Sequence, residues 1–244
     1  MFRIFAIIPA RDEAATVAET VETVCGIPGV EHVLVIDDGS RDDTARLATA
    51  AGARVIAHSR SRGKGSALEA GLVALDGAKA MGWEPPDAVL FLDADLGQAA
   101  AEASLLLGPI LTGDAEMTIA AFPRPPRGAG GFGLVKGLAR RGIRSLGSRT
   151  YDATSPLSGQ RALSKRAMRA VRPIASGYGV EVALTIKALQ AGLRVLEVPT
   201  TMTHRHTGRD VSGFLHRGRQ FVDIAVTLAT LALDGRGPAE TPRT

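Results

Sequence analysis

The chain has 244 residues, with 29 Lys and Arg against 25 Asp and Glu, 45% hydrophobic residues and only 4% aromatic residues. This length predicts one α/β domain with a sizeable core built mainly from Ala, Val, Leu and Ile. The net charge of +4 favours an anionic partner, such as nucleic acid, a phosphorylated metabolite or an acidic membrane surface. The single cysteine, Cys25, excludes an internal disulfide framework, and we expect it to be a packed thiol in a reducing cytosol.

Neither a signal peptide nor a membrane span is predicted. The apolar run near the N-terminus covers only about five residues before Arg11, which is too short for a signal peptide. The longest apolar segment, 221–233, is interrupted by Asp223 and is shorter than a membrane span. We therefore expect a cytoplasmic protein, and the basic residues leave open a peripheral contact at the inner face of the membrane.

Short apolar runs alternate with helical patterns in the first half of the chain, as a parallel sheet flanked by helices requires. We predict strands at 4–8, 33–36, 54–57 and 88–92, and helices at 16–24, 44–51 and 66–81. The second half is less regular. There we predict a loop at 123–133, helices at 164–171, 181–191 and 214–233, a strand at 194–198, and a disordered tail at 234–244.

Polar clusters follow the predicted strands at their carboxyl ends, where open α/β sheets bind ligands. Asp93 and Asp95 follow the fourth strand, and both carboxylates could hold one Mg²⁺ or Mn²⁺ against phosphate oxygens. A solvated turn is the alternative. Asp37 and Asp38 follow the second strand and could accept hydrogen bonds from a base or ribose, in a turn that also leads into a capped helix.

Two basic segments could bind phosphate. Lys64 lies in the Gly-flanked loop 60–65 before a helix, an arrangement that suits phosphate although the spacing of a P-loop is missing. His204, His206 and His216 lie among arginines, which indicates a metal ligand, a phosphate-binding loop or a solvated basic face. Because the sequence has no Gly-x-Ser-x-Gly elbow, hydrolase chemistry is disfavoured.

Taken in order, these segments resemble the family-2 glycosyltransferases of the GT-A fold. The motifs that carry the resemblance are Ile8–Glu13, Val35–Thr44, Gly63–Ala67, Phe91–Leu96 and Ser158–Arg161. The resemblance covers most of the chain, roughly 4–220. It implies an α/β, Rossmann-like fold with a mixed, mostly parallel sheet flanked by helices. It also implies a single domain at 1–233, with a nucleotide-sugar-binding half at 1–97 and an acceptor-binding half at 98–233.

The resemblance implies a metal-dependent hexosyltransferase that uses a nucleoside-diphosphate sugar and a phosphate-bearing acceptor. The implied nucleotide-sugar contacts are Pro9, Ala10, Arg11, Glu13, Asp37, Asp38, Lys64, Asp93, Ala94 and Asp95. The implied acceptor contacts are Ser158, Gly159, Gln160, Arg161 and Arg205, and the implied ligands of Mg²⁺ or Mn²⁺ are Asp93, Asp95 and His204. Asp95 and Glu181 are the candidate catalytic residues, with Glu181 as an acid or base near the acceptor or as a packed carboxylate at a helix start.

Two subgroups of this family compete for the acceptor. Ser158–Arg161 is similar to a motif of the polyprenyl- and dolichol-phosphate sugar transferases, although Gln160 stands where an aromatic residue is usual. Pro156–Gly159, Gly177–Glu181 and His204 are more similar to glucosyl-3-phosphoglycerate synthases. The first group inverts the anomeric centre and the second retains it, so the stereochemistry stays open. A homodimer is considered as one oligomeric state.

Two other classes of function are weighed against a glycosyltransferase. A sugar-nucleotide-forming nucleotidyltransferase would have a glycine-arginine signature after the first strand, where Pro9–Asp12 stands instead. A nucleic-acid-binding module would interleave aromatic residues with its basic ones, but the segment 124–149 has only Phe132. We therefore expect no nucleic-acid partner.

Overall fold

The computed structural model describes residues 2–122, 133–175, 177–202 and 211–234, and of residues 81, 178, 211–220 and 234 it describes the backbone alone. Nearly all of the predicted loop at 123–133 and the predicted tail beyond residue 234 lie outside the described residues, as do the site candidates His204 and Arg205.

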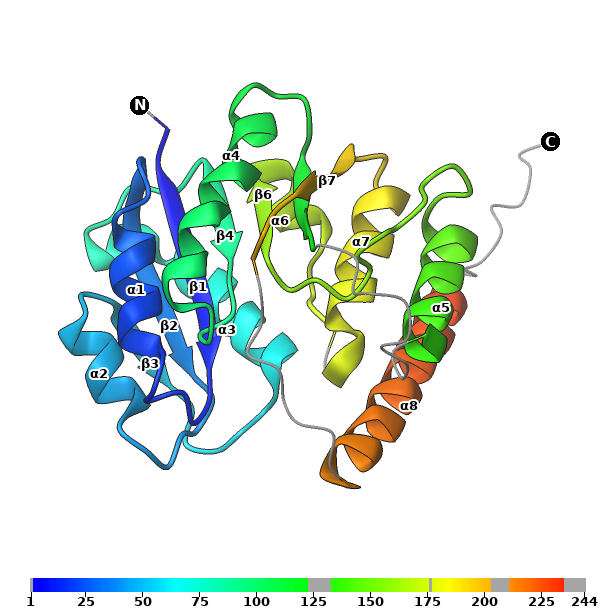
Figure 1. Ribbon diagram of the computed structural model, residues 1–244. Helices are drawn as coiled ribbons and strands as arrows, with labels where there is room; N and C mark the ends of the chain where they lie inside the picture. Colours follow the sequence, from blue (N-terminus) through cyan, green and yellow to red (C-terminus); the bar gives the residue numbers. More distant parts are fainter. Residues whose placement is uncertain (1, 123–132, 176, 203–210, 235–244) are drawn as a thin grey trace.

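A seven-stranded sheet forms the centre of the molecule, in the order β3-β2-β1-β4-β6-β5-β7 (Figure 1). The strands are β1 (Ile4–Ala10), β2 (Val30–Asp37), β3 (Arg54–Ala57), β4 (Ala88–Phe91), β5 (Met117–Ala121), β6 (Arg161–Ser164) and β7 (Val195–Pro199). Only β6 runs antiparallel to its neighbours, β4 and β5. The predicted fold class, a mixed and mostly parallel sheet, is confirmed.

Helices cover both faces of the sheet because side chains along each strand alternate between two hydrophobic clusters. Ile4, Ala6 and Ile8 face α1 (Val17–Cys25), α2 (Thr44–Ala50) and α4 (Ser104–Leu111). Phe5 and Ile7 face α3 (Lys64–Asp76), α6 (Lys165–Ala170) and α7 (Val180–Gln190). Short helical turns fill the connections: η1 (Ala78–Met81), η2 (Gly97–Ala103), η3 (Ile143–Gly147) and η4 (Gly177–Gly179).

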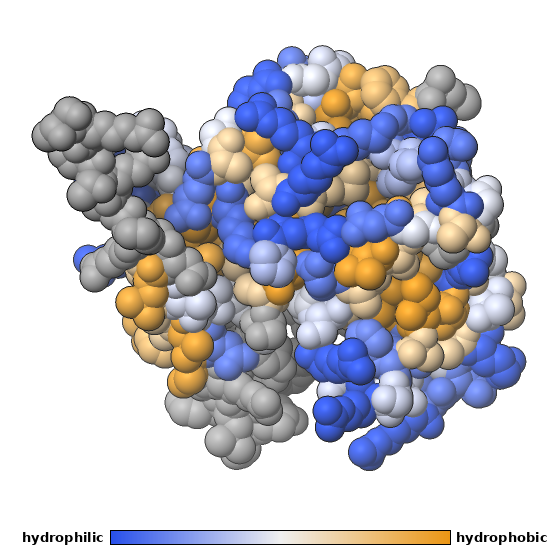
Figure 2. Space-filling model, turned by 180° about the vertical axis from the view of Figure 1, so that it is seen from behind, coloured by the Kyte–Doolittle hydropathy of each residue, from blue (hydrophilic) through white to orange (hydrophobic). Residues whose placement is uncertain are grey.

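Helices α5 (Gly133–Gly142) and α8 (Val211–Asp234) pack side by side at the edge of the molecule, next to α7 (Figure 1). Between these helices lies a third hydrophobic cluster, in which Ile224 and Leu231 of α8 are buried. On its other side, α8 exposes Val222, Val226 and Leu233, and apolar side chains are visible along this edge from behind (Figure 2). Within the described part of the chain, every helix is too short or too polar to cross a bilayer.

The predicted elements are present in both halves of the chain, but the second half also contains elements that were not predicted. The helices predicted at 164–171, 181–191 and 214–233 are α6, α7 and α8, and the strand predicted at 194–198 is β7. All four predicted strands and three predicted helices of residues 1–97 are present. The prediction that the first strand stops at Pro9 was wrong: beyond Ile7, β1 pairs only with β2, so the missing N–H of Pro9 interrupts no ladder with β4. The sequence analysis missed β5, β6, α4 and α5. Cys25, expected to be packed, is exposed because it ends α1 on the solvent side.

Candidate active site

A pocket of about 550 Å³ opens at the carboxyl ends of β1, β2 and β4. Its volume lies in the range of small-molecule sites. Six of the predicted nucleotide-sugar contacts line it, namely Pro9, Ala10, Arg11, Asp38, Lys64 and Asp93. The other lining residues are Ser61, Arg62, Gly63, Gly177 and Asp223. The sequence therefore located the pocket, and the structure adds a wall from the second half of the chain.

The loop after β3 is held in shape by the buried carboxylate of Asp38. This carboxylate accepts hydrogen bonds from the backbone N–H groups of Arg62 and Gly63, both at 2.8 Å, and from the Ser61 hydroxyl at 2.7 Å. His58 Nδ1 lies 2.9 Å away. Burial alone would raise the pKa of Asp38, but these hydrogen bonds outweigh it and lower the pKa. Asp38 is thus an ionised anchor of the loop as well as part of the pocket wall.

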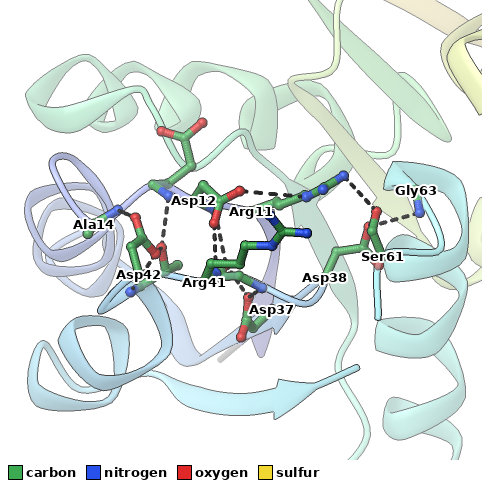
Figure 3. A network of polar contacts seen from close by, with 12 residues as sticks. Arg11, Asp12, Ala14, Asp37, Asp38, Arg41, Asp42, Ser61 and Gly63 are labelled. Carbon is green, nitrogen blue, oxygen red and sulfur yellow. Dashed lines mark hydrogen bonds and ion pairs between the residues drawn. The ribbon is translucent and has the colours of Figure 1, made fainter. Parts of the chain in front are cut away.

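A second set of hydrogen bonds joins the loops after β1 and β2 (Figure 3). Asp12 accepts from the backbone N–H of Arg41 at 2.8 Å, and its own N–H donates to the Ser40 hydroxyl at 2.9 Å. Asp37 accepts from the backbone N–H of Ser40 at 3.0 Å. Arg11 continues the network by donating to Ser61 at 3.0 Å. Asp37, predicted as a nucleoside contact, is buried and supports this turn from behind the pocket.

Lys64 occupies the first turn of α3, so the N–H groups at the positive end of this helix face the pocket together with a cation. Its ammonium lies 2.6 Å from Asp93 Oδ1 and 3.0 Å from Glu181 Oε1. Burial would lower the pKa of Lys64, but the two carboxylates outweigh it and raise the pKa. The ammonium is therefore charged and fixed in direction.

Gly159 allows this ion-pair cluster to form. A Cβ atom at position 159 would collide with the Lys64 ammonium and would lie 3.0 and 3.1 Å from the carboxylate oxygens of Asp93. The next residue, Gln160, donates from Nε2 to Asp93 Oδ2 at 2.8 Å. Both oxygens of Asp93 thus accept from side chains of the chain itself, and because each oxygen has a second lone pair, Asp93 can also coordinate a metal ion with these partners in place.

Carboxylates collect beside the pocket at Asp95 and Glu13. The pKa of Glu13 is raised by burial and then by the charge of Asp95, while a hydrogen bond from Thr16 acts in the opposite direction. Such mutual repulsion is relieved when a divalent cation binds, which fits the chemistry expected of Asp95. In the described ranges no three His, Cys, Asp or Glu side chains converge as a complete metal site, and the predicted ligand His204 lies outside those ranges.

Three of the predicted acceptor contacts, Ser158, Gln160 and Arg161, are buried. Arg161 is completely buried in β6, where Nε donates to the Ser158 carbonyl at 3.0 Å and Nη1 to Thr185 Oγ1 at 2.9 Å. Gln160 is also fully buried and Ser158 nearly so. Neither Arg161 nor Gln160 lines the pocket, and their hydrogen bonds hold the turn that contains Gly159, so their contact with the acceptor stays a prediction.

Five lining residues were not predicted as contacts. Ser61, Arg62 and Gly63 lie in the loop 60–65 that was expected to suit phosphate, whereas Gly177 and Asp223 lie outside every motif to which a binding role was given. Gly177 begins the segment Gly177–Glu181, which indicated a family resemblance but no binding role for the glycine itself. Asp223 is the only charged residue between Phe221 and Leu233, and an isolated acid in an apolar helical segment could have indicated a role in binding.

The α/β fold, with a pocket at the carboxyl ends of its parallel strands, is the architecture of an enzyme that binds a nucleotide. The comparisons with known proteins agree with this class. Residues 5–171 match the family described as glycosyl transferase family 2, so the chain belongs to that family and is a glycosyltransferase. The predicted family and enzyme class are confirmed in preference to the nucleotidyltransferase alternative, and the expected absence of a nucleic-acid partner stays a prediction.

The similar proteins give more detail about relatives of this chain. It is 30% identical to the glucosyl-3-phosphoglycerate synthase of Mycolicibacterium paratuberculosis, with 95% of this chain and 74% of that protein covered. It is 31% identical to glycosyltransferase AglJ of Haloferax volcanii, over 84% of this chain and 64% of the other. A crystal structure of the Mycobacterium tuberculosis glucosyl-3-phosphoglycerate synthase with Mn²⁺, UDP and phosphoglyceric acid superimposes with a TM-score of 0.76 at 28% identity, covering 94% of this chain and 78% of that one.

Proposed function

We propose that this glycosyltransferase moves glucose from UDP-glucose to 3-phosphoglycerate or a closely similar phosphorylated acid, with Mg²⁺ or Mn²⁺ as cofactor. The observation that carries the proposal is the pocket at the strand ends, where the N-terminus of α3, the Lys64 ammonium and the carboxylate of Asp93 adjoin one another. Structures of the related mycobacterial synthase contain UDP-glucose, phosphoglyceric acid and Mn²⁺ together. We infer the identity of the sugar, the nucleotide and the acceptor from the similarity of this chain to that synthase.

The charges of the pocket suit the reaction. The bond that breaks joins the anomeric carbon of the sugar to the diphosphate, so negative charge grows on the departing nucleoside diphosphate. The ammonium of Lys64 and the N–H groups at the start of α3 stabilise this charge. Pro9, Ala10 and Arg11 form the end of the pocket that receives the nucleoside.

Asp95 and, outside the described residues, His204 would hold the metal ion, which supplies additional positive charge to the diphosphate when bound. Glu181 is only 9% exposed and lies against Lys64. This position supports a role in directing the Lys64 ammonium rather than in proton transfer with the acceptor. The stereochemical outcome stays a question for product analysis.

The proposal is tested by thermal shift with UDP-, GDP- and ADP-glucose, each with and without Mn²⁺, followed by mass spectrometry of the products. We expect UDP-glucose to stabilise the protein only with metal, and glucosyl phosphoglycerate to form. A Lys64→Met variant should lose the stabilisation, whereas Lys165→Met, which removes an ammonium paired with Asp87 outside the pocket, should keep it. Transfer to polyprenyl phosphate alone, or no response to any nucleotide sugar, would overturn the proposal.

The predicted peripheral membrane contact and the predicted homodimer stay predictions. The exposed apolar side of α8, with Val222, Val226 and Leu233, is the described surface that either would use. Salt-sensitive co-sedimentation with anionic vesicles would support the membrane contact. A molecular mass twice that of the chain by light scattering, lowered by Val226→Asp, would support the dimer.

A further inference from the structure

The pocket contains an acid on α8 that neither the nucleotide nor the metal explains. Asp223 lines the pocket and lies in the middle of a 24-residue helix, so it caps neither end. Aspartate is a poor residue for a helix interior. Its neighbours from Phe221 to Leu233 are otherwise apolar, alanine or threonine. The intrinsic helix propensity of aspartate therefore does not favour it at this position.

Two glycines let the polar side of α8 approach the pocket. A Cβ atom at Gly177, where φ is +76°, would lie 2.9 Å from Asp223 Oδ2. A Cβ atom at Gly179 would collide with the hydroxyl of Thr227, one turn further along α8. Thr227 in turn donates to the backbone carbonyl of Asp223 at 2.8 Å. The contact between η4 and α8 thus sets the carboxylate of Asp223 into the pocket wall.

The other groups of the pocket restrict what this carboxylate can bind. Lys64 and the N–H groups at the start of α3 attract phosphate, and a carboxylate repels it. Pro9, Ala10 and Asp38 form the part of the pocket at the ends of β1 and β2, on the first half of the chain. Asp223 and Gly177 come from the second half. An ionised carboxylate accepts hydrogen bonds only, so hydroxyl groups are the uncharged partners that it recognises best.

We propose that Asp223 is a binding residue for sugar or acceptor hydroxyl groups in the part of the pocket away from the nucleoside. This inference rests on the proposed function, since it assumes that a nucleotide sugar occupies the remainder of the pocket. The hydroxyls belong either to the hexose of the donor or to the acceptor. The two sources are distinguished by measuring the affinity for UDP-glucose and the KM for 3-phosphoglycerate.

The experiment compares wild type with Asp223→Asn, which keeps the size of the side chain and removes its charge. Affinities for UDP and UDP-glucose are measured by calorimetry with Mn²⁺, and KM for 3-phosphoglycerate by steady-state kinetics. If the hydroxyls belong to the donor, the variant binds UDP-glucose roughly tenfold more weakly and binds UDP as before. If they belong to the acceptor, both donor affinities are unchanged and KM for 3-phosphoglycerate rises roughly tenfold.

Two controls keep a structural effect apart from a binding effect. Asp152→Asn removes an exposed carboxylate that pairs with Arg140 and does not line the pocket, and it should change none of these values. The thermal midpoint of Asp223→Asn should stay close to that of wild type. Equal weakening of UDP and UDP-glucose, or no change in any of the three constants, would overturn the role of Asp223.

The wild-type measurement decides the proposed function, and the ratio of variant to wild type decides the role of Asp223. If wild type binds a different nucleotide sugar, the proposed donor is wrong, and the same ratio is measured with the sugar that binds. If wild type binds no nucleotide sugar at all, both proposals are overturned.

Discussion

The two walls of the pocket are held in place by different kinds of interaction. On the wall from the first half of the chain, carboxylates such as Asp38 accept several backbone N–H groups and so fix the loops that follow the strands. On the wall from the second half, Gly159, Gly177 and Gly179 permit close contacts because they have no side chain. The first wall therefore depends on ionised carboxylates that accept hydrogen bonds, and the second depends on glycines, where any side chain would collide with its neighbours.

The largest effect is expected at Asp95, the predicted metal ligand beside the pocket. Asp95→Ala should lower turnover roughly 10²- to 10³-fold, the usual loss when one group that stabilises the transition state is removed. The thermal shift caused by UDP-glucose with Mn²⁺ should disappear as well. Unaltered far-UV circular dichroism would show that the fold survives. Wild-type rates in this variant, with and without chelator, would remove Asp95 from the metal site.

A single methyl group at position 159 should disturb the ion pair between Lys64 and Asp93. In Gly159→Ala the new Cβ would displace the Lys64 ammonium or the Asp93 carboxylate, so we expect kcat to fall roughly 10- to 100-fold. Gly137→Ala is the matched control: nothing lies within 4 Å of a Cβ there, in the middle of α5. That control should keep its activity and gain up to about 1 kcal/mol of stability. Equal kinetics in both variants would contradict the proposed crowding around Gly159.

The first wall could be predicted from the sequence because its signals are local. Each buried strand of residues 1–97 is a short apolar run followed directly by its polar loop, so the pattern of apolar and polar residues alone assigns Asp38 and Asp93 to one edge of the sheet. The roles within that edge could not be assigned. Asp37 and Asp38 are adjacent, yet only Asp38 reaches the pocket, because successive side chains of a strand point in opposite directions.

The second wall was harder to predict because its contacts join distant segments. An arginine after Ser-Gly-Gln indicates a polar loop, but Arg161 begins the antiparallel strand β6 and is buried between β4 and β5. Asp223 reaches the pocket because α8 packs against η4, about 45 residues earlier in the chain. Patterns of apolar residues are read over windows of about 11–18 residues, so they carry no information on this contact. Burial of a charge and helix docking are tertiary effects, which override local preference.

A substitution of Arg161 tests whether its buried hydrogen bonds hold the turn that contains Gly159. Arg161→Met would leave the Ser158 carbonyl and Thr185 hydroxyl without their buried donor, at a cost of about 2–3 kcal/mol in the free energy of unfolding. Turnover should fall while KM for UDP-glucose stays within a factor of about two, because the nucleoside wall is untouched. Recovery of turnover in Arg161→Lys would support a positioning role. If kcat of Arg161→Met matched wild type, the turn would not depend on Arg161.

The smallest effect, and the one that depends on pH, is expected at Asp38 on the first wall. Asp38→Asn replaces one carboxylate oxygen with an N–H₂ group, so one of the two backbone N–H donors, of Arg62 or of Gly63, would face another donor, which should cost about 1–2 kcal/mol of unfolding free energy at pH 7. Because the pKa of Asp38 is lowered in the folded state, its contribution is complete above the unfolded value of about 4 and is lost as the pH falls through the folded value.

Urea unfolding of Asp38→Asn and wild type at pH 7 and at successively lower pH measures this difference directly. The gap between the two proteins should be widest at pH 7 and should narrow only below about pH 4, as the wild-type carboxylate takes up its proton. Asp43→Asn is the control, because that carboxylate is exposed and pairs only with Arg46 among the described residues, so little change is expected at any pH. A gap that stays constant down to pH 2 would show that Asp38 acts through its shape and not its charge, and the contrast between the two walls would then be lost.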